Sequence, residues 1–159
     1  MTLLIVDTTV LSNFARIDRV DLLGLALSGS GAMTEIVYTE LQAGEILGRF
    51  PVSDWGWLPI IQLTTEETAL YGRLTLQLDN GEASCLALAI TREGVLVTDD
   101  QAARRYALSA GVAVVGTLGM LRILVRMGRC TQSEADELLI AMIQQGYRSP
   151  VRSLSELGD

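Results

Sequence analysis

Short apolar runs with little polar alternation recur along the chain, a pattern typical of buried parallel strands. Between these runs, apolar residues recur three or four positions apart, which predicts amphipathic helices. The expected strands cover residues 2–6, 32–34, 60–63, 95–98 and 112–115. The expected helices cover about residues 10–17, 20–27, 35–47, 66–78, 82–90, 99–110, 118–127 and 132–144.

Strands that alternate with helices predict the fold class. We expect an α/β protein, a three-layer α/β/α sandwich around a mainly parallel central sheet. The length of 159 residues suits one domain, and no internal repeat or linker is visible. We assign residues 1–145 to this domain. Residues 146–159, which contain Pro150 and several serines, are expected to form a loose C-terminal tail.

The composition supports a real core and no membrane contact. Hydrophobic residues make up 49% of the chain, and the mean hydropathy is +0.34. No apolar run is long enough to cross a bilayer, and the residues before Asp7 are too few for a signal peptide. Two cysteines cannot form a disulfide framework. We therefore expect a cytoplasmic protein.

Missing residue types exclude several chemistries. The chain has no histidine and no lysine, and all 12 basic residues are arginine. This excludes Ser-His-Asp triads, histidine-bound zinc, P-loops and Schiff bases. The net charge of −7 also disfavours nucleic-acid binding through a broad basic face, although a site with divalent cations and local arginines stays possible.

Carboxylates stand at the ends of apolar runs in four separate parts of the chain. Asp7 ends the first strand, Asp99 and Asp100 follow a later one, and Glu40 and Glu82 lie near predicted helix starts. In parallel α/β folds, the carboxyl ends of the strands form the ligand-binding edge. Clustered carboxylates repel one another unless a hard cation such as Mg²⁺ or Mn²⁺ lies among them. The pattern therefore predicts a metal-dependent enzyme.

Five segments, in this order, resemble the PIN-domain nucleases, and most of all the prokaryotic branch that includes VapC-type toxins and their uncharacterised relatives. The resemblance covers about residues 2–125 and implies Mg²⁺- or Mn²⁺-dependent hydrolysis of phosphodiester bonds, usually in single-stranded RNA. The segments are Ile5–Leu11, Thr39–Leu41, Gly81–Ala89, Leu96–Arg104 and Gly116–Gly119.

The resemblance also implies which residues act. The catalytic acids would be Asp7, Glu40, Glu82 and Asp100. The third acid is more often Asp in the family, so Glu82 reaches one methylene farther. The family's Thr-any-Asp spacing selects Asp100 as the fourth acid, with Asp99 as a helper. The expected metal ligands are Asp7, Glu82, Asp99 and Asp100.

Three further residues are expected to contact substrate. Thr8 and Thr117 match hydroxyl positions that often line the site in the family. Arg104 follows the acidic pair by about one helical turn, where it could contact phosphate or instead pair with Asp99 or Asp100.

The resemblance implies partners as well. Family members commonly form homodimers, and toxin members are blocked by a cognate antitoxin that inserts into the site. We therefore expect the toxin of a toxin–antitoxin pair, which acts on single-stranded RNA.

Other interpretations remain open. Asp7, Glu82 and Asp99 could simply cap helices, and Glu40 could be a solvated helix residue. A non-catalytic PIN-fold binding module would keep the fold and a weak metal site. A haloacid-dehalogenase-like phosphatase would also begin with a strand and an Asp, but it needs a second Asp where Thr9 stands, and a lysine.

Overall fold

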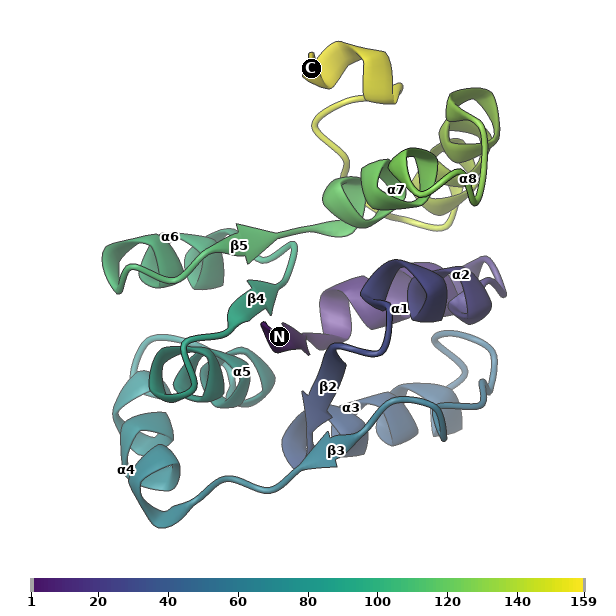
Figure 1. Cartoon of the computed structure of the whole chain (residues 1–159). Coiled ribbons are helices and arrows are strands. Elements are labelled where there is room, and N and C mark those ends of the chain that lie inside the picture. Colours follow the sequence, from purple (N-terminus) through teal and green to yellow (C-terminus); the bar gives the residue numbers. More distant parts are fainter. Residues whose placement is uncertain (1, 159) are drawn as a thin grey trace.

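The computed structural model describes residues 2–158 and is built around a parallel sheet (Figure 1). Five strands in this part of the chain pair in the order β3-β2-β1-β4-β5, all in parallel. They are β1 (Leu4–Val6), β2 (Gly31–Thr34), β3 (Ile60–Ile61), β4 (Val95–Val97) and β5 (Val114–Val115).

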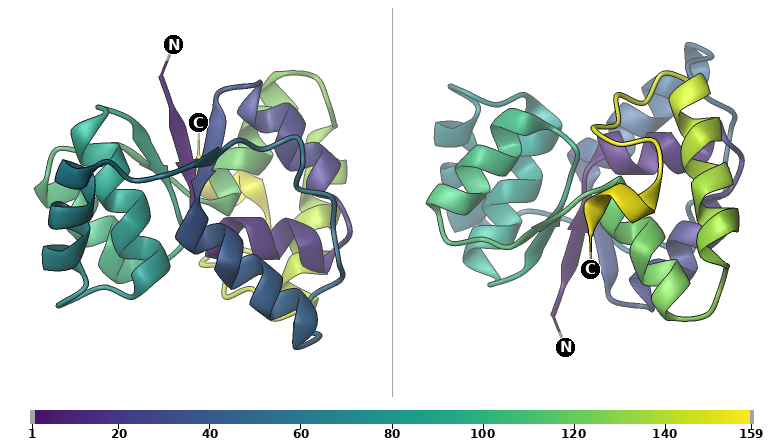
Figure 2. Two further views of the ribbon diagram at one scale, coloured as in Figure 1. Left: turned by 90° about the horizontal axis from the view of Figure 1, so that it is seen from below. Right: turned by 90° about the horizontal axis from the view of Figure 1, so that it is seen from above.

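Helices cover both faces of the sheet (Figure 2). Helices α4, α5 and α6 pack together on one face, and α1, α2, α7 and α8 on the other, while α3 contacts both α1 and α5. The bounds are α1 (Thr8–Arg16), α2 (Val20–Leu27), α3 (Glu35–Ile46), α4 (Thr65–Leu74), α5 (Asn80–Thr91), α6 (Gln101–Ser109), α7 (Thr117–Arg126), α8 (Gln132–Gln144) and the 3₁₀ helix η1 (Leu154–Leu157). The predicted three-layer α/β/α class is confirmed.

The strand order reverses at β1, which lies between β2 and β4. Parallel α/β sheets open a crevice at the carboxyl ends of the strands where this reversal occurs. Asp7 directly follows β1, while Asp99 and Asp100 lie just beyond the end of β4. The topology therefore brings residues some ninety positions apart to the same edge of the sheet.

Side-chain caps set the starts of two helices that bound this edge. Asp100 caps α6 by accepting a hydrogen bond from the amide of Ala103 (2.8 Å), so the prediction that this helix begins at Asp99 was wrong by two residues. Asp79 caps α5 by accepting from the amide of Glu82 (3.1 Å), so that helix begins at Asn80 rather than at Glu82. In both cases the carboxylate stands immediately before the first residue of the helix.

The core lies between the sheet and its two helix layers. Ile5 and Leu96 from the sheet, Leu11 and Phe14 from α1, and Leu86 from α5 are fully buried there. Within residues 2–158, none of the helices has the length and apolar character needed to span a membrane.

Residues 146–158, predicted as part of a loose tail, follow α8, and the 3₁₀ helix η1 within them contacts that helix. Leu154 is buried, and its amide donates to Asp136 Oδ1 (2.8 Å). The hydroxyl of Ser153 donates to Asp136 Oδ2 (3.0 Å). One carboxylate of α8 therefore holds the turn that begins η1.

Candidate functional site

Asp7 lies at the centre of the crevice and is only 2% exposed. Its carboxylate accepts hydrogen bonds from the amide of Thr8 (2.8 Å) and the hydroxyl of Thr98 (2.9 Å). Burial raises the pKa of Asp7 to about 7, and the charges of Asp79 and Glu40 push the pKa in the same direction. Asp7 thus caps α1 and is also a desolvated acid among other acids.

Glu40 reaches the same place from α3. Its Oε1 accepts a hydrogen bond from the hydroxyl of Thr8 (2.7 Å). The carboxylate also lies directly on the backbone of Gly81, where a Cβ would collide with Glu40 Oε1. Burial raises the pKa of Glu40, and the nearby Asp79 adds to the shift. Glycine at position 81 is therefore what allows Glu40 to approach the start of α5.

The start of α5 contributes two acids, the N-cap Asp79 and Glu82 in the first turn. Glu82 is 8% exposed, and burial, followed by the charges of Asp79, Asp100 and Asp7, raises its pKa to about 9. The side-chain interaction of Glu82 with Asp79 raises the pKa of Glu82 further. Asp79 is not among the residues predicted from the sequence, although an Asp three positions before a Glu is a signature of a helix start.

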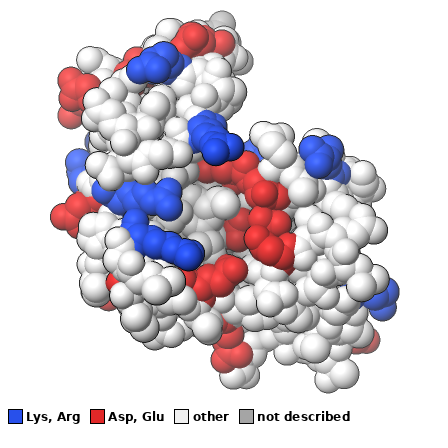
Figure 3. Space-filling model, turned by 180° about the vertical axis from the view of Figure 1, so that it is seen from behind, with Lys and Arg blue, Asp and Glu red and all other residues white. Residues whose placement is uncertain are grey.

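Asp100 completes the group from the start of α6. Its amide donates to the hydroxyl of Thr98 (3.1 Å), the same hydroxyl that donates to Asp7. Its charge also contributes to the raised pKa of Glu82. We call these five acids the carboxylate cluster, and its members are Asp7, Glu40, Asp79, Glu82 and Asp100. Figure 3 shows acidic side chains gathered in a hollow of one face, with arginines beside them.

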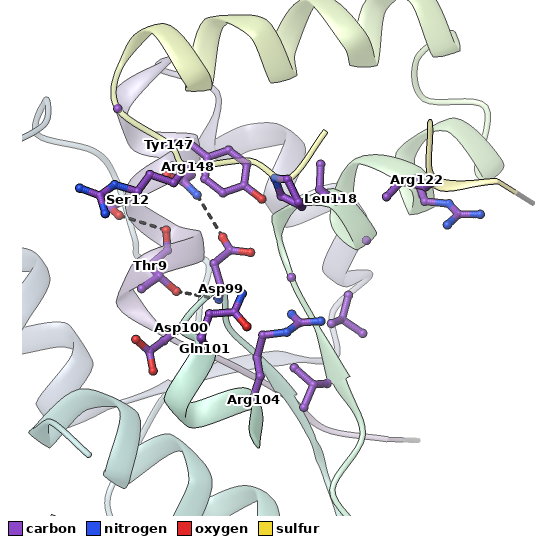
Figure 4. Close-up of a pocket in the computed structure, with 18 of the residues that line it drawn as sticks. Thr9, Ser12, Asp99, Asp100, Gln101, Arg104, Leu118, Arg122, Tyr147 and Arg148 are labelled. Atoms are coloured by element: carbon purple, nitrogen blue, oxygen red, sulfur yellow. Dashed lines mark hydrogen bonds between the residues drawn. The ribbon is translucent and has the colours of Figure 1, made fainter. Parts of the chain in front are cut away.

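Asp99 faces a different environment from its neighbour (Figure 4). Its carboxylate accepts hydrogen bonds from the Asn13 amide (3.1 Å), the Thr117 backbone amide (2.9 Å) and the Thr117 hydroxyl. Thr117 is fully buried. Arg104 donates to the carbonyl of Thr98 (3.0 Å), and its charge acts against the burial that raises the pKa of Asp99. Asp99 therefore ties the end of β4 to α1 and α7.

The structure thus brings four of the predicted residues together, namely Asp7, Glu40, Glu82 and Asp100. Of the other predicted site residues, Thr8 holds Glu40 in place, while Asp99 and Thr117 form a buried network beside the cluster. The N-termini of α1, α5 and α6 all point toward the cluster, and their partial positive charges offset part of the repulsion. A capping role and a place in the cluster are therefore compatible.

The chemistry of the donor set suits a hard divalent cation. All the cluster atoms are carboxylate oxygens, which Mg²⁺ and similar ions prefer. As arranged, no group of three or more His, Cys, Asp or Glu side chains among residues 2–158 could hold a metal ion. Burial and the neighbouring carboxylates hold the pKa of Glu82 at about 9 in this arrangement. Ion binding would require the carboxylates to be ionised and to draw together.

A family model described as a PIN domain (DUF3368) matches residues 3–157, nearly the whole chain, including the segment after α8. The chain belongs to this PIN-domain family. No curated protein shows significant sequence similarity to it. PIN domains are generally metal-dependent nucleases.

Proposed function

We propose that the protein is a metal-dependent endoribonuclease that hydrolyses phosphodiester bonds in single-stranded RNA. The observation that carries this proposal is the convergence of five carboxylates from β1, α3, α5 and α6 on one crevice. Without a bound cation, the mutual repulsion of these carboxylates destabilises the folded protein. Destabilising arrangements of this kind are typical of functional sites. The PIN-domain family supports a nuclease.

Asp7, Glu82 and Asp100 would hold a divalent cation, either Mg²⁺ or Mn²⁺. When bound, such an ion supplies an activated water and compensates negative charge on the phosphate. Glu40, held by the Thr8 hydroxyl, would orient the attacking water. The chain has neither histidine nor lysine, so neither of these common general bases competes for this role.

We assign Asp99 to positioning the end of β4 against α1 and α7, in place of the metal-binding role predicted from the sequence. Its oxygens already accept hydrogen bonds from Asn13 and Thr117. Thr117 is fully buried, so it would act on the substrate through Asp99 and the start of α7.

We also propose that this ribonuclease is the toxin of a toxin–antitoxin pair and that it acts as a cytoplasmic homodimer. The resemblance to VapC-type proteins supports this part of the proposal. The net charge of −7 suits a partner with basic segments. Induced expression in a bacterial host should then arrest growth, and the Glu82→Gln variant should relieve the arrest.

The test of the substrate class compares labelled single-stranded RNA and DNA pools of equal sequence diversity. The protein should cut the RNA pool with Mn²⁺ or Mg²⁺ and should cut neither pool in EDTA. Preferential cutting of DNA would contradict the ribonuclease proposal. If neither pool is cut while Mn²⁺ binding is measurable by calorimetry, the non-catalytic binding module becomes the better account.

A further inference from the structure

A pocket of about 920 Å³ adjoins the carboxylate cluster (Figure 4). Its volume lies near the upper end of the range for ligand pockets, about 300–1,000 Å³. Residues of α1, α6, α7 and the segment after α8 line it, and Asp99 and Asp100 stand at its boundary with the cluster. A ligand in this pocket would therefore extend toward the acids.

Positive charge is concentrated in the pocket wall. Four of the twelve arginines of this acidic chain line it, namely Arg16, Arg104, Arg122 and Arg148. The two ion pairs formed within residues 2–158 involve other arginines. Arg104 and Arg122 each donate to one backbone carbonyl, and Arg16 and Arg148 donate no side-chain hydrogen bond to any residue from 2 to 158. Guanidinium groups with unused donors are suited to phosphate.

The segment after α8 supplies one wall of the pocket. Gly146, with φ of +110°, turns the chain at the end of α8, and the amide of Tyr147 donates to the carbonyl of Met142 (3.0 Å). The other end of the segment is held through Asp136. Between these anchors, Tyr147 and Arg148 lie over Asp99, on the side of the pocket opposite Arg104 (Figure 4). Tyr147 is half-buried and Arg148 is exposed.

We infer that this pocket binds the single-stranded RNA next to the scissile bond. The arginines would contact backbone phosphates, and Tyr147 would stack on a base, because aromatic rings and arginines are the usual contacts to single strands. The segment after α8 is then part of the substrate site. This inference rests on the proposed function, since the carboxylate cluster defines where the scissile bond lies.

The test measures RNA binding without cleavage. A fluorescein-labelled single-stranded RNA is titrated with the protein in EDTA, and anisotropy gives Kd over a range of salt concentrations. Arg148→Ala should weaken binding about 3- to 10-fold and reduce the slope of log K against log salt by about 0.7, the value for one phosphate contact on a single strand. Arg73→Ala, which removes the same charge from the exposed surface of α4, is the matched control and should change neither quantity.

A second pair of variants tests the stacking contact. Tyr147→Ala should weaken RNA binding at least about fivefold, whereas Tyr147→Phe, which keeps the ring, should bind as the wild type does. Thermal unfolding of each variant checks that the fold is retained.

Three results would overturn the inference: no RNA binding by the wild type in EDTA, equal effects of Arg148→Ala and Arg73→Ala, or normal binding by Tyr147→Ala. A different result would show that the pocket binds RNA but that the protein is not a ribonuclease. In that case RNA binding would depend on Arg148, but metal would induce no cleavage.

Discussion

Asp99 and Asp100 are adjacent in the chain, yet their carboxylates face different surroundings. Asp100 accepts a hydrogen bond from the amide of Ala103 and belongs to the carboxylate cluster. Asp99 accepts from Asn13 and Thr117, which lie on the opposite face of the sheet from α6. The end of β4 therefore supplies one acid to the cluster and one to the network that joins β4 to α1 and α7.

The different surroundings of Asp99 and Asp100 predict different outcomes for the matched variants Asp99→Asn and Asp100→Asn. Asn caps helices about as well as Asp, so Asp100→Asn should fold normally and lose at least about 100-fold in metal-dependent RNA cleavage. Asp99→Asn replaces one acceptor oxygen by an NH₂ group, which cannot accept the hydrogen bonds that Asn13 and Thr117 donate. This variant should therefore destabilise the protein by about 1–3 kcal/mol. Cleavage rates and thermal unfolding together check both expectations. Equal losses of activity in the two variants, with unchanged stability, would contradict these separate roles of Asp99 and Asp100.

Glu82 should make the metal-free protein less stable as pH rises. The pKa of Glu82 is raised from 4.5 to about 9 in the folded protein, so between these values the folded state binds more protons than the unfolded state. Glu82→Gln stays neutral and can still donate to Asp79. In EDTA at pH 8, its Tm should therefore exceed that of the wild type, by roughly 2–4 °C for each kcal/mol gained, and the gain should disappear near pH 4.

Glu137→Gln is the control for this prediction, because Glu137 is an exposed glutamate of α8. Its Tm should follow that of the wild type across the pH range. Parallel Tm curves for Glu82→Gln and the wild type would show that Glu82 is already ionised in the metal-free protein.

Gly81→Ala should separate activity from stability. A Cβ at position 81 would displace the Glu40 carboxylate, which is the mobile end of a side chain, while alanine favours the helix by about 0.5–1 kcal/mol. We expect an unchanged or higher Tm and a loss of at least about tenfold in cleavage rate. Gly72→Ala, on α4 with open space around the added Cβ, is the control and should retain full activity. Full activity in Gly81→Ala would argue against a role for the position of Glu40.

Glu67 should contribute to stability at a distance from the site. Its carboxylate accepts hydrogen bonds from Arg92 (2.9 Å), Thr91 (2.6 Å) and the amide of Thr64 (2.9 Å), which lowers its pKa from 4.5 to about 2, Arg92 being the largest cause. The stabilisation is therefore complete above about pH 4.5 and is lost as pH falls toward 2.

Glu67→Gln leaves Arg92 without its ion-pair partner and should cost about 1–3 kcal/mol at pH 7, measured by urea unfolding, with no change in cleavage. The difference should vanish near pH 2. The exposed Glu66→Gln serves as the control. A pH-independent difference would contradict the assigned pKa of Glu67.

The fold and four of the five cluster acids could be predicted because their signals are local. Apolar runs define the strands, and Asp7 and Asp100 stand at or just beyond strand ends that a parallel sheet must bring to one edge. Glu40 and Glu82 lie near predicted helix starts, and the order of the family motifs matches both to catalytic positions. Asp79 falls between the expected helices 66–78 and 82–90 and was not predicted as a site residue, although its spacing to Glu82 fits a helix start.

The rest of the site depends on contacts between distant residues. Tyr147 and Arg148 lie in a segment without apolar periodicity, and its path depends on Asp136 binding the backbone of Leu154, eighteen residues away. Asn13 meets Thr117 across 104 positions of the chain. No local pattern in a single sequence predicts such pairs.

The central claim is that the carboxylate cluster cuts RNA with the help of a divalent cation. The most direct test is the cleavage rate of a labelled single-stranded RNA by the wild type and Asp7→Asn, with Mn²⁺ and with EDTA. Asp18→Asn is the control, because Asp18 is exposed and its φ of +56° suits asparagine. We predict Mn²⁺-dependent cleavage by the wild type and Asp18→Asn, and a rate at least about 100-fold lower for Asp7→Asn. Wild-type cleavage by Asp7→Asn, or cleavage that persists in EDTA, would contradict the claim.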